Sequence, residues 1–203
     1  MKITVVVDNK GWCWTTTARE VSLALPWHDF RIIPAAKYTP SVKDEFVWCR
    51  GYSYILRGIP TCPWVWTMTT GGDQLEVRLN QNDYKEYPVI CQCRSVHYRL
   101  TTMGYSAHLI PNGINTIKFH PKSTGKRQKL IIGMAGNVAK DRAELKGLPQ
   151  TQAACERAGA KLSLLSDMPH SRMPIYYRSL FAYAQPSHSE GCSNSVMEAM
   201  ASG

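Results

Sequence analysis

Two carboxylates stand eight residues apart near the end of the chain, Glu190 and Glu198, within the segment SEGCSNSVMEAMASG. The segment changes from small and polar residues to apolar ones. This change predicts a loop that carries Glu190 and a helix that contains Glu198 one turn from its start. Free N–H groups at a helix start favour anionic or polyhydroxyl ligands. The spacing therefore predicts that both carboxylates face one ligand, and a phosphorylated sugar has suitable chemistry.

Both carboxylates also have a purely structural interpretation. Ser195 and Glu198 have the spacing of a capping box, in which Glu198 would only satisfy backbone donors at the helix start. Glu190 would then be an ordinary exposed loop carboxylate. The spacing alone leaves both interpretations open.

The composition indicates a globular protein that needs neither disulfides nor a metal. The 203 residues are 44% hydrophobic, and no apolar run approaches the roughly 20 residues that span a bilayer. In the N-terminal segment MKITVVVD, Asp8 ends the apolar run too early for a secretory signal, so we expect a cytoplasmic protein. Seven scattered cysteines favour reduced thiols, and no Cys/His cluster completes a metal site.

The net charge of +9 is concentrated in the second half of the chain, where no acidic residue occurs between Lys118 and Lys140. This stretch could attract phosphates or an anionic membrane surface, which would place the protein peripherally at the inner membrane face. A solvated basic linker explains the same stretch equally well.

The first half reads as a series of strands and helices. The β-branched run at residues 3–7 predicts a strand, and the capping-box pattern of Thr17 and Glu20 predicts a helix over residues 17–25. Short apolar runs predict further strands at 30–33, 46–49, 64–68 and 89–93. Continuous apolar strands indicate a parallel sheet that is covered on both faces.

The pattern restarts after the turn signal Pro111-Asn112-Gly113. We expect strands at 129–133 and 161–165, a loop at 135–146, helices at 149–158 and 173–179, an extended segment at 181–185 and a helix containing Glu198. Two βα series predict an α/β fold with two Rossmann-like domains, residues 1–110 and 111–203, that face each other across a cleft.

Three motifs in the second half together resemble the donor-binding domain of the retaining GT-B glycosyltransferases known as family 4 or group 1. IPNGINTIKFHP at 110–121 resembles the interdomain signature of that family. Lys146-Gly147 resembles its donor-phosphate pair, and Glu190 to Glu198 resembles its E-x7-E motif, followed by Glu-Ala-Met-Ala-x-Gly. The resemblance implies a GT-B fold and transfer of a sugar from a nucleotide-diphosphate donor to a carbohydrate, lipid-linked or small-molecule acceptor, without a further cofactor.

The resemblance also implies roles for the matching residues. Glu198 would accept hydrogen bonds from the ribose hydroxyls of the donor, and Glu190 would contact its sugar or support the reacting centre. Lys146 would neutralise the diphosphate as it leaves, so its charge would act most strongly in the transition state. Retaining members of this family are thought to need no enzyme base.

Further residues are expected around the donor and the acceptor. The amides of Gly191, Cys192 and Ser193 would approach the sugar and the phosphates. The family commonly has Gly-Arg before the Lys-Gly pair, whereas this chain has Gly136-Asn137. Arg142 or Lys140 would then supply the missing cation, and Asn137 would be a hydrogen-bonding substitute.

The start of the first half resembles, more faintly, the acceptor domain of some family members. The resemblance assigns the loop with Gly11 and Trp12 to the acceptor side. Aromatic rings of Trp12 and Trp14 could bind sugar C–H surfaces if both lie in this loop. No histidine has an obvious carboxylate partner, and His188 is the one closest to Glu190 in sequence.

Family members continue beyond Ala-x-Gly with further βα units. The resemblance therefore implies that the second domain is incomplete, and we expect these 203 residues alone to be poorly active.

Two other functions fit parts of the sequence. A viral DNA-modifying glycosyltransferase would suit the charge, but the chain lacks a dense basic and aromatic stripe, so nucleic acid is not an expected partner. The second alternative function is that of a non-catalytic module that binds a nucleotide sugar.

Overall fold

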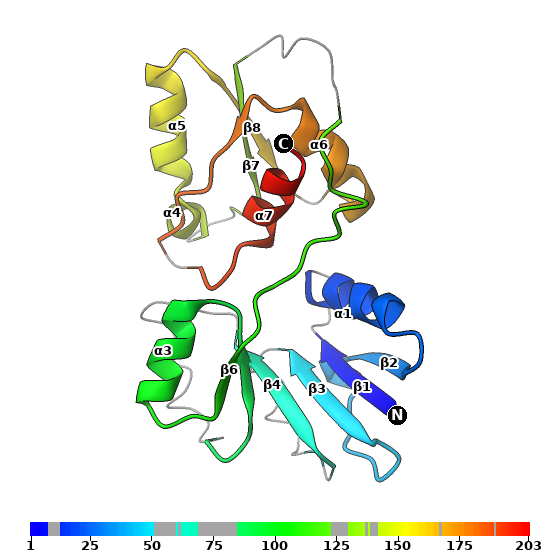
Figure 1. Cartoon of the computed structure of the whole chain (residues 1–203). Helices are drawn as coiled ribbons and strands as arrows, with labels where there is room; N and C mark the ends of the chain where they lie inside the picture. Colours follow the sequence, from blue (N-terminus) through cyan, green and yellow to red (C-terminus); the bar gives the residue numbers. More distant parts are fainter. Residues whose placement is uncertain are drawn as a thin grey trace. The chain divides into compact units, whose positions relative to one another are not determined.

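A computed structural model describes residues 1–7, 13–50, 60, 62–68, 85–122, 130–136, 138, 142–166, 168–188 and 190–203. The chain divides into two compact units, Met1–Pro111 and Asn112–Gly203. Each unit is an α/β unit built on a parallel sheet (Figure 1). Four residues with a predicted role, Gly11, Trp12, Asn137 and Lys140, lie outside the described residues.

The first unit contains a six-stranded sheet with the order β2-β1-β3-β4-β5-β6, in which each strand is parallel to its neighbours. The strands are β1 Lys2–Val7, β2 Asp29–Pro34, β3 Phe46–Arg50, β4 Trp64–Met68, β5 Val89–Cys91 and β6 Ala107–Leu109. The strand order reverses between β1 and β3, which is the position where open α/β sheets bind ligands. The residues that follow β1 and β3, 8–12 and 51–59, lie outside the described residues.

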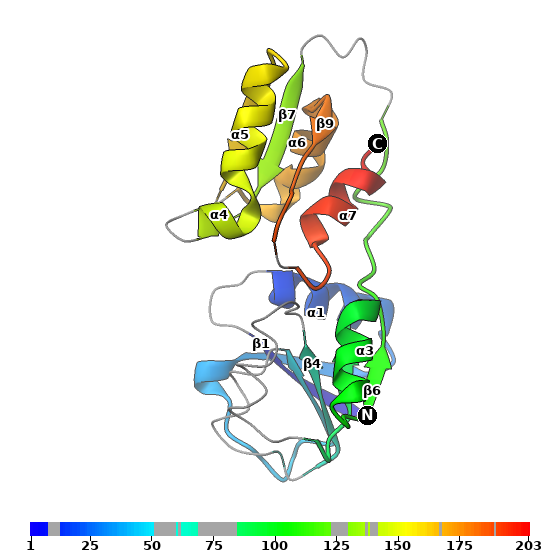
Figure 2. The ribbon, with the colours of Figure 1, turned by 90° about the vertical axis from the view of Figure 1, so that its left-hand side faces the viewer.

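Strand β1 shows why a continuous apolar run predicted a sheet covered on both faces. Val5 and Val7 are buried in one cluster with Ala18 of helix α1, Cys13–Ala24. Val6, which points to the other face, is buried in a cluster that includes Val96 of helix α3, Arg94–Thr102. Figure 2 shows the two helices with this sheet. The expectation of a doubly covered parallel sheet is confirmed.

Helix α1 begins earlier than predicted. It starts at Cys13, so Thr17 and Glu20 lie inside the helix and do not form its N-terminal capping box. Trp14 lies in this helix and packs, partly buried, against the cluster of β1, so its placement in a binding loop was wrong. Helix α3, strand β6 and a short 3-10 helix, Ala35–Lys37, were not predicted.

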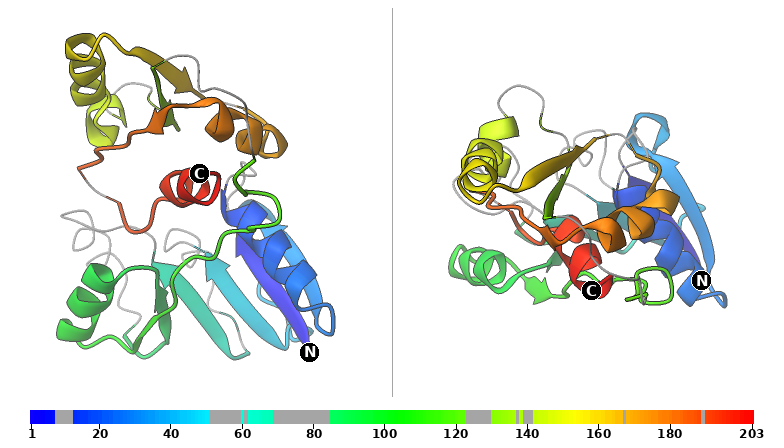
Figure 3. Two further views of the ribbon diagram at one scale, coloured as in Figure 1. Left: turned by 45° about the horizontal axis from the view of Figure 1, so that its top comes forward. Right: turned by 90° about the horizontal axis from the view of Figure 1, so that it is seen from above.

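The second unit contains a three-stranded parallel sheet with the order β8-β7-β9. Its strands are β7 Ile131–Ala135, β8 Lys161–Leu165 and β9 Ala182–Tyr183. The helices are α4 Arg142–Lys146, α5 Leu148–Arg157, α6 Met173–Ser179 and α7 Asn194–Ala201, with a 3-10 turn at His170–Arg172. Helices α5 and α6 flank the sheet (Figure 3). Helix α4 corrects the prediction of a loop over residues 135–146.

The core of the second unit is aromatic. Phe119, Tyr176, Tyr177 and Leu180 are buried together with Ala135 of the central strand. Gly133 allows α6 to end close to that strand, because a Cβ atom there would lie 2.1 Å from Leu180 Cδ1. None of the helices in the described parts of the chain has the length and apolar character needed to cross a membrane.

Candidate functional site

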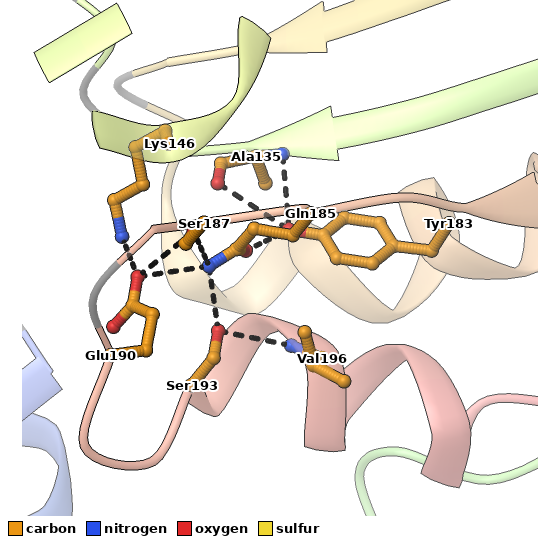
Figure 4. Close-up of polar contacts among 8 residues, drawn as sticks. All are labelled: Ala135, Lys146, Tyr183, Gln185, Ser187, Glu190, Ser193 and Val196. Atoms are coloured by element: carbon orange, nitrogen blue, oxygen red, sulfur yellow. Dashed lines mark hydrogen bonds and ion pairs between the residues drawn. The ribbon is translucent and has the colours of Figure 1, made fainter. Parts of the chain in front are cut away.

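Lys146 and Glu190, which were predicted to act on the same ligand, form an ion pair (Figure 4). Lys146 is the last residue of α4, and Glu190 lies in the loop between β9 and α7. Their side chains keep 21% and 31% of their surface exposed. The pair is therefore partly shielded, while solvent still reaches both charged groups.

The glycine after Lys146 lets the two elements approach each other. Gly147 has a left-handed φ of 76°, and a Cβ atom there would lie 2.3 Å from the carbonyl oxygen of Pro186. The same loop is held to α4 by a 2.9 Å bond from His188 N–H to the carbonyl of Leu145. Because a side chain at residue 147 would push Pro186 away, glycine at this position helps to set the distance between Lys146 and Glu190.

Gln185 holds Glu190 from the other side and was not predicted. Its Nε2 donates to Glu190 Oε1 at 3.0 Å and to Ser193 Oγ at 2.9 Å. Its Oε1 accepts from the Tyr183 hydroxyl at 2.8 Å. Ser187 Oγ also lies 3.4 Å from Glu190 Oε1. We call Lys146, Gln185, Ser187, Glu190 and Ser193 the Glu190 cluster.

Ser193 is the capping residue of α7. Its side chain accepts a hydrogen bond from Val196 N–H, in the helix that begins at Asn194. Because the cap is Ser193, the capping-box interpretation of Ser195 and Glu198 is wrong. Glu198 is the fifth residue of this helix, and its side chain turns toward α6 and the 3-10 turn instead.

Glu198 is 8% exposed, and each of its carboxylate oxygens has a protein partner. Oε1 lies 2.7 Å from His170 Nε2, and Oε2 accepts from the Tyr177 hydroxyl at 3.0 Å. Lys118 Nζ lies 2.8 Å from His170 Nδ1. An ammonium group can only donate, so Nδ1 accepts and Nε2 carries the hydrogen that points to Glu198. Lys118, His170, Tyr177 and Glu198 form the Glu198 cluster.

Burial and the nearby Glu198 raise the pKa of Tyr177 far above its ordinary value. The phenol therefore remains protonated and donates to the carboxylate. Phe119 packs against the cluster: its ring centroid lies 5.4 Å from that of His170 and 6.1 Å from that of Tyr177. The prediction that no histidine has a carboxylate partner was wrong, because His170 contacts Glu198. The sequence did not reveal this pair, since the two residues lie 28 positions apart.

Segment 112–121, which is most of the predicted interdomain signature at 110–121, belongs to this site. It supplies Lys118 and Phe119, and its first residue, Asn112, donates to Asn194 Oδ1 at 2.8 Å at the start of α7. At the other end of α7, a Cβ atom on Gly203 would lie 3.2 Å from Pro121 Cβ. The segment therefore contacts both ends of the helix that carries Glu198.

The remaining predicted residues are placed as follows. Gly191 and Cys192 follow Glu190 in the same loop, and the Cys192 thiol donates to Met197 Sδ at 3.6 Å. Arg142 begins α4 and is exposed, and the contacts described for it do not include Lys146 or Glu190. His188 Nε2 lies 3.4 Å from Gln150 Nε2. The contacts described for Glu190 and Glu198 share no residue, but the two clusters are neighbours: the ring of Tyr177 lies 5.5 Å from that of Tyr183, which donates to Gln185.

The described residues contain no group of three or more His, Cys, Asp or Glu side chains that could hold a metal ion. The polar groups of the two clusters are two carboxylates, two ammonium groups, an imidazole, an amide and hydroxyls, which suit hydrogen bonding to an anionic or hydroxylated ligand.

The fold is that of the GT-B glycosyltransferases, with Rossmann-like α/β units on parallel sheets. The chain is similar to sucrose-phosphate synthase from Thermosynechococcus elongatus, with a TM-score of 0.69 and 13% identity over 98% of this chain and 79% of that one. It is also similar to two structures of TarM, with TM-scores of 0.56 and 0.52 and identities of 10% and 12%.

Each TarM match covers 77% of this chain and 39% of the TarM chain. One of these structures is a mutant of the S. aureus protein in complex with fondaparinux, α-GlcNAc-glycerol and UDP. No protein-family model and no curated protein sequence matches the chain. The similarity to the solved structures establishes the fold.

Proposed function

We propose that the chain is the donor-binding part and the adjoining unit of a retaining glycosyltransferase that resembles family 4. The observation that carries the proposal is the ion pair between Lys146 and Glu190, directly before the N-terminus of α7, on a GT-B fold. The donor would be a nucleotide-diphosphate sugar, and the acceptor a carbohydrate, a lipid-linked group or a small molecule.

Lys146 and the start of α7 would hold the diphosphate. The N–H groups of a helix start and an ammonium group both stabilise negative charge. In the transfer, the bond between the sugar C1 and the phosphate oxygen breaks, and the acceptor oxygen bonds to C1 on the same face. The acceptor proton passes to the leaving phosphate oxygen. The charge that develops on this oxygen is the charge that Lys146 would stabilise.

Glu198 would bind the ribose while it keeps its protein partners. A carboxylate has about four lone-pair sites, and His170 and Tyr177 use one on each oxygen. Two sites remain for the vicinal hydroxyls of a ribose. His170 and Tyr177 would therefore fix the carboxylate without blocking it.

The test is calorimetric titration of the whole chain with UDP, GDP and ADP. We expect one of them to bind, Lys146→Ala to weaken that binding at least tenfold, and Lys161→Ala, an exposed lysine at the start of β8, to leave it unchanged. Glu198→Gln should reduce the preference for the ribonucleotide over its 2′-deoxy analogue. Failure of all three nucleotides to bind would refute the proposal. Binding without sugar transfer in the intact protein would instead indicate a nucleotide-sugar binding module.

A further inference from the structure

Gln185 stands where strand β9 passes into the loop that carries Glu190, and its amide orientation follows from its partners. The Glu190 carboxylate accepts hydrogen bonds, so the Gln185 Nε2 group faces it at 3.0 Å. The opposite atom, Oε1, then faces the Tyr183 hydroxyl at 2.8 Å, which donates to it. The reversed amide would place one oxygen against another at Glu190.

These contacts form a hydrogen-bond chain with one direction (Figure 4). Ala135 N–H, at the end of the central strand β7, donates to the Tyr183 oxygen at 3.1 Å. The Tyr183 proton faces Gln185 at 2.8 Å, closer than the Ala135 carbonyl at 3.4 Å. Gln185 Nε2 donates to Glu190 and to the Ser193 cap of α7, at shorter distances than the 3.3 Å to Ser187 Oγ. Successive bonds of this kind polarise each other and strengthen the chain. Burial raises the pKa of Tyr183 to about 12, so its phenol keeps the proton that it donates.

The two ends of the hydrogen-bond chain differ in exposure to solvent. Ala135 is 4% exposed in the core, whereas Glu190 lies in an exposed loop. Lys146 is the charged partner among the contacts described for Glu190, and under the proposed function it turns to the diphosphate when a donor binds. Gln185 and Ser187 are then the described side chains that still hold Glu190, and the Gln185 bond is the shorter one, at 3.0 Å against 3.4 Å.

We propose that Gln185 is a positioning residue that fixes Glu190 and the N-terminus of α7 relative to each other, so that both act on one donor. Its effect on catalysis rests on the proposed function, whereas its effect on the loop does not. The sequence motifs do not mark this residue, and its role follows from the contacts that place one side chain between a carboxylate and a helix cap.

The catalytic test compares donor binding with transfer in the intact protein. Gln185→Leu should lower the rate constant of transfer at least tenfold and change the dissociation constant of the nucleoside diphosphate by less than about threefold. Tyr183→Phe should give a smaller loss, and the double variant should be no worse than Gln185→Leu, because Tyr183 acts through Gln185. Gln152→Leu, at an exposed site on α5, is the matched control. Equal losses in binding and transfer, or additive losses in the double variant, would overturn the proposal.

A second measurement does not depend on activity. In 15N spectra, the side-chain amide signals of Gln185, assigned by their absence in Gln185→Leu, should move in Glu190→Gln, Ser193→Ala and Tyr183→Phe. They should stay in place in Gln152→Leu. Backbone amides at the start of α7 should exchange faster in Gln185→Leu or, if that variant fails to fold, in Tyr183→Phe. Unmoved signals in Glu190→Gln and unchanged exchange would overturn the positioning role, whether or not the chain binds nucleotides.

Discussion

Replacing Glu190 by glutamine should tighten the binding of a nucleoside diphosphate while it impairs sugar transfer. The amide keeps the shape of the side chain and an oxygen that can accept from Gln185. It removes the negative charge that pairs with Lys146. Lys146 would then no longer have to leave an ion pair before it meets the diphosphate.

The size of this gain follows from the exposure of the pair. Exposed ion pairs contribute about 0.2–1 kcal/mol. The Lys146 and Glu190 side chains are 21% and 31% exposed, so we take the upper end of that range. A contribution of about 1 kcal/mol corresponds to a roughly fivefold lower dissociation constant. The transfer rate should fall instead, because the amide lacks the negative charge with which Glu190 would contact the sugar or support the reacting centre under the proposed function.

The assay is calorimetric titration with the tightest-binding nucleoside diphosphate, at low salt and at 0.5 M salt. The ratio between wild type and Glu190→Gln should shrink at high salt, because salt screens the partly exposed pair. Glu156→Gln, at an exposed position on α5, controls for a general change in charge. Unchanged or weaker binding in Glu190→Gln would refute the idea that Glu190 and the diphosphate compete for Lys146.

Three further predictions concern stability and are measured by urea denaturation. Gly147→Ala should lower the free energy of unfolding by about 2 kcal/mol or more, because it adds the clash with Pro186 to the left-handed backbone. Gly159 has a φ of 61°, but a Cβ atom there would have nothing within 4 Å, so Gly159→Ala should cost only about 1 kcal/mol. Equal losses of stability in Gly147→Ala and Gly159→Ala would contradict the argument. Tyr177→Phe should cost about 1–3 kcal/mol, because it leaves one buried oxygen of Glu198 without its donor, and a neutral effect would show that this bond is unimportant. Burial raises the pKa of Cys49 from 9.0 to about 12. Above pH 9 the unfolded state therefore binds fewer protons than the folded state, and stability should fall by up to about 1.4 kcal/mol per pH unit, a slope that Cys49→Ala should reduce.

Much of the fold could be predicted because buried strands carry their own signal. The apolar runs at 64–68 and 161–165 coincide with β4 and β8, and the helix predicted at 173–179 coincides with α6. Helix α3 lacked that signal, since only Val96 and Leu100 among its residues are buried. Helix α4 was missed because five residues make too short a pattern.

The site was predicted in part for a similar reason. Motifs identified Lys146, Glu190 and Glu198 as candidates, but their neighbours depend on contacts between distant parts of the chain. Glu190 and its partner Lys146 lie 44 residues apart. Gln185 and His170 belong to none of the motifs, and their roles depend on where β9 and the 3-10 turn come to lie. A sequence can show which side chains are able to bind a ligand, whereas the fold decides which of them meet.

The contacts of segment 112–121 with both ends of α7 have a mechanical consequence. Asn112, the first residue of the second unit, is bonded to Asn194, and Pro121 lies against Gly203. The helix is thus clamped at its two ends by the stretch of chain that leads out of the first unit. A ligand that displaces α7 along its axis must also pull on this stretch. A shift of α7 on ligand binding at Glu198 would therefore disturb the bond from Asn112, the residue at which the second unit begins.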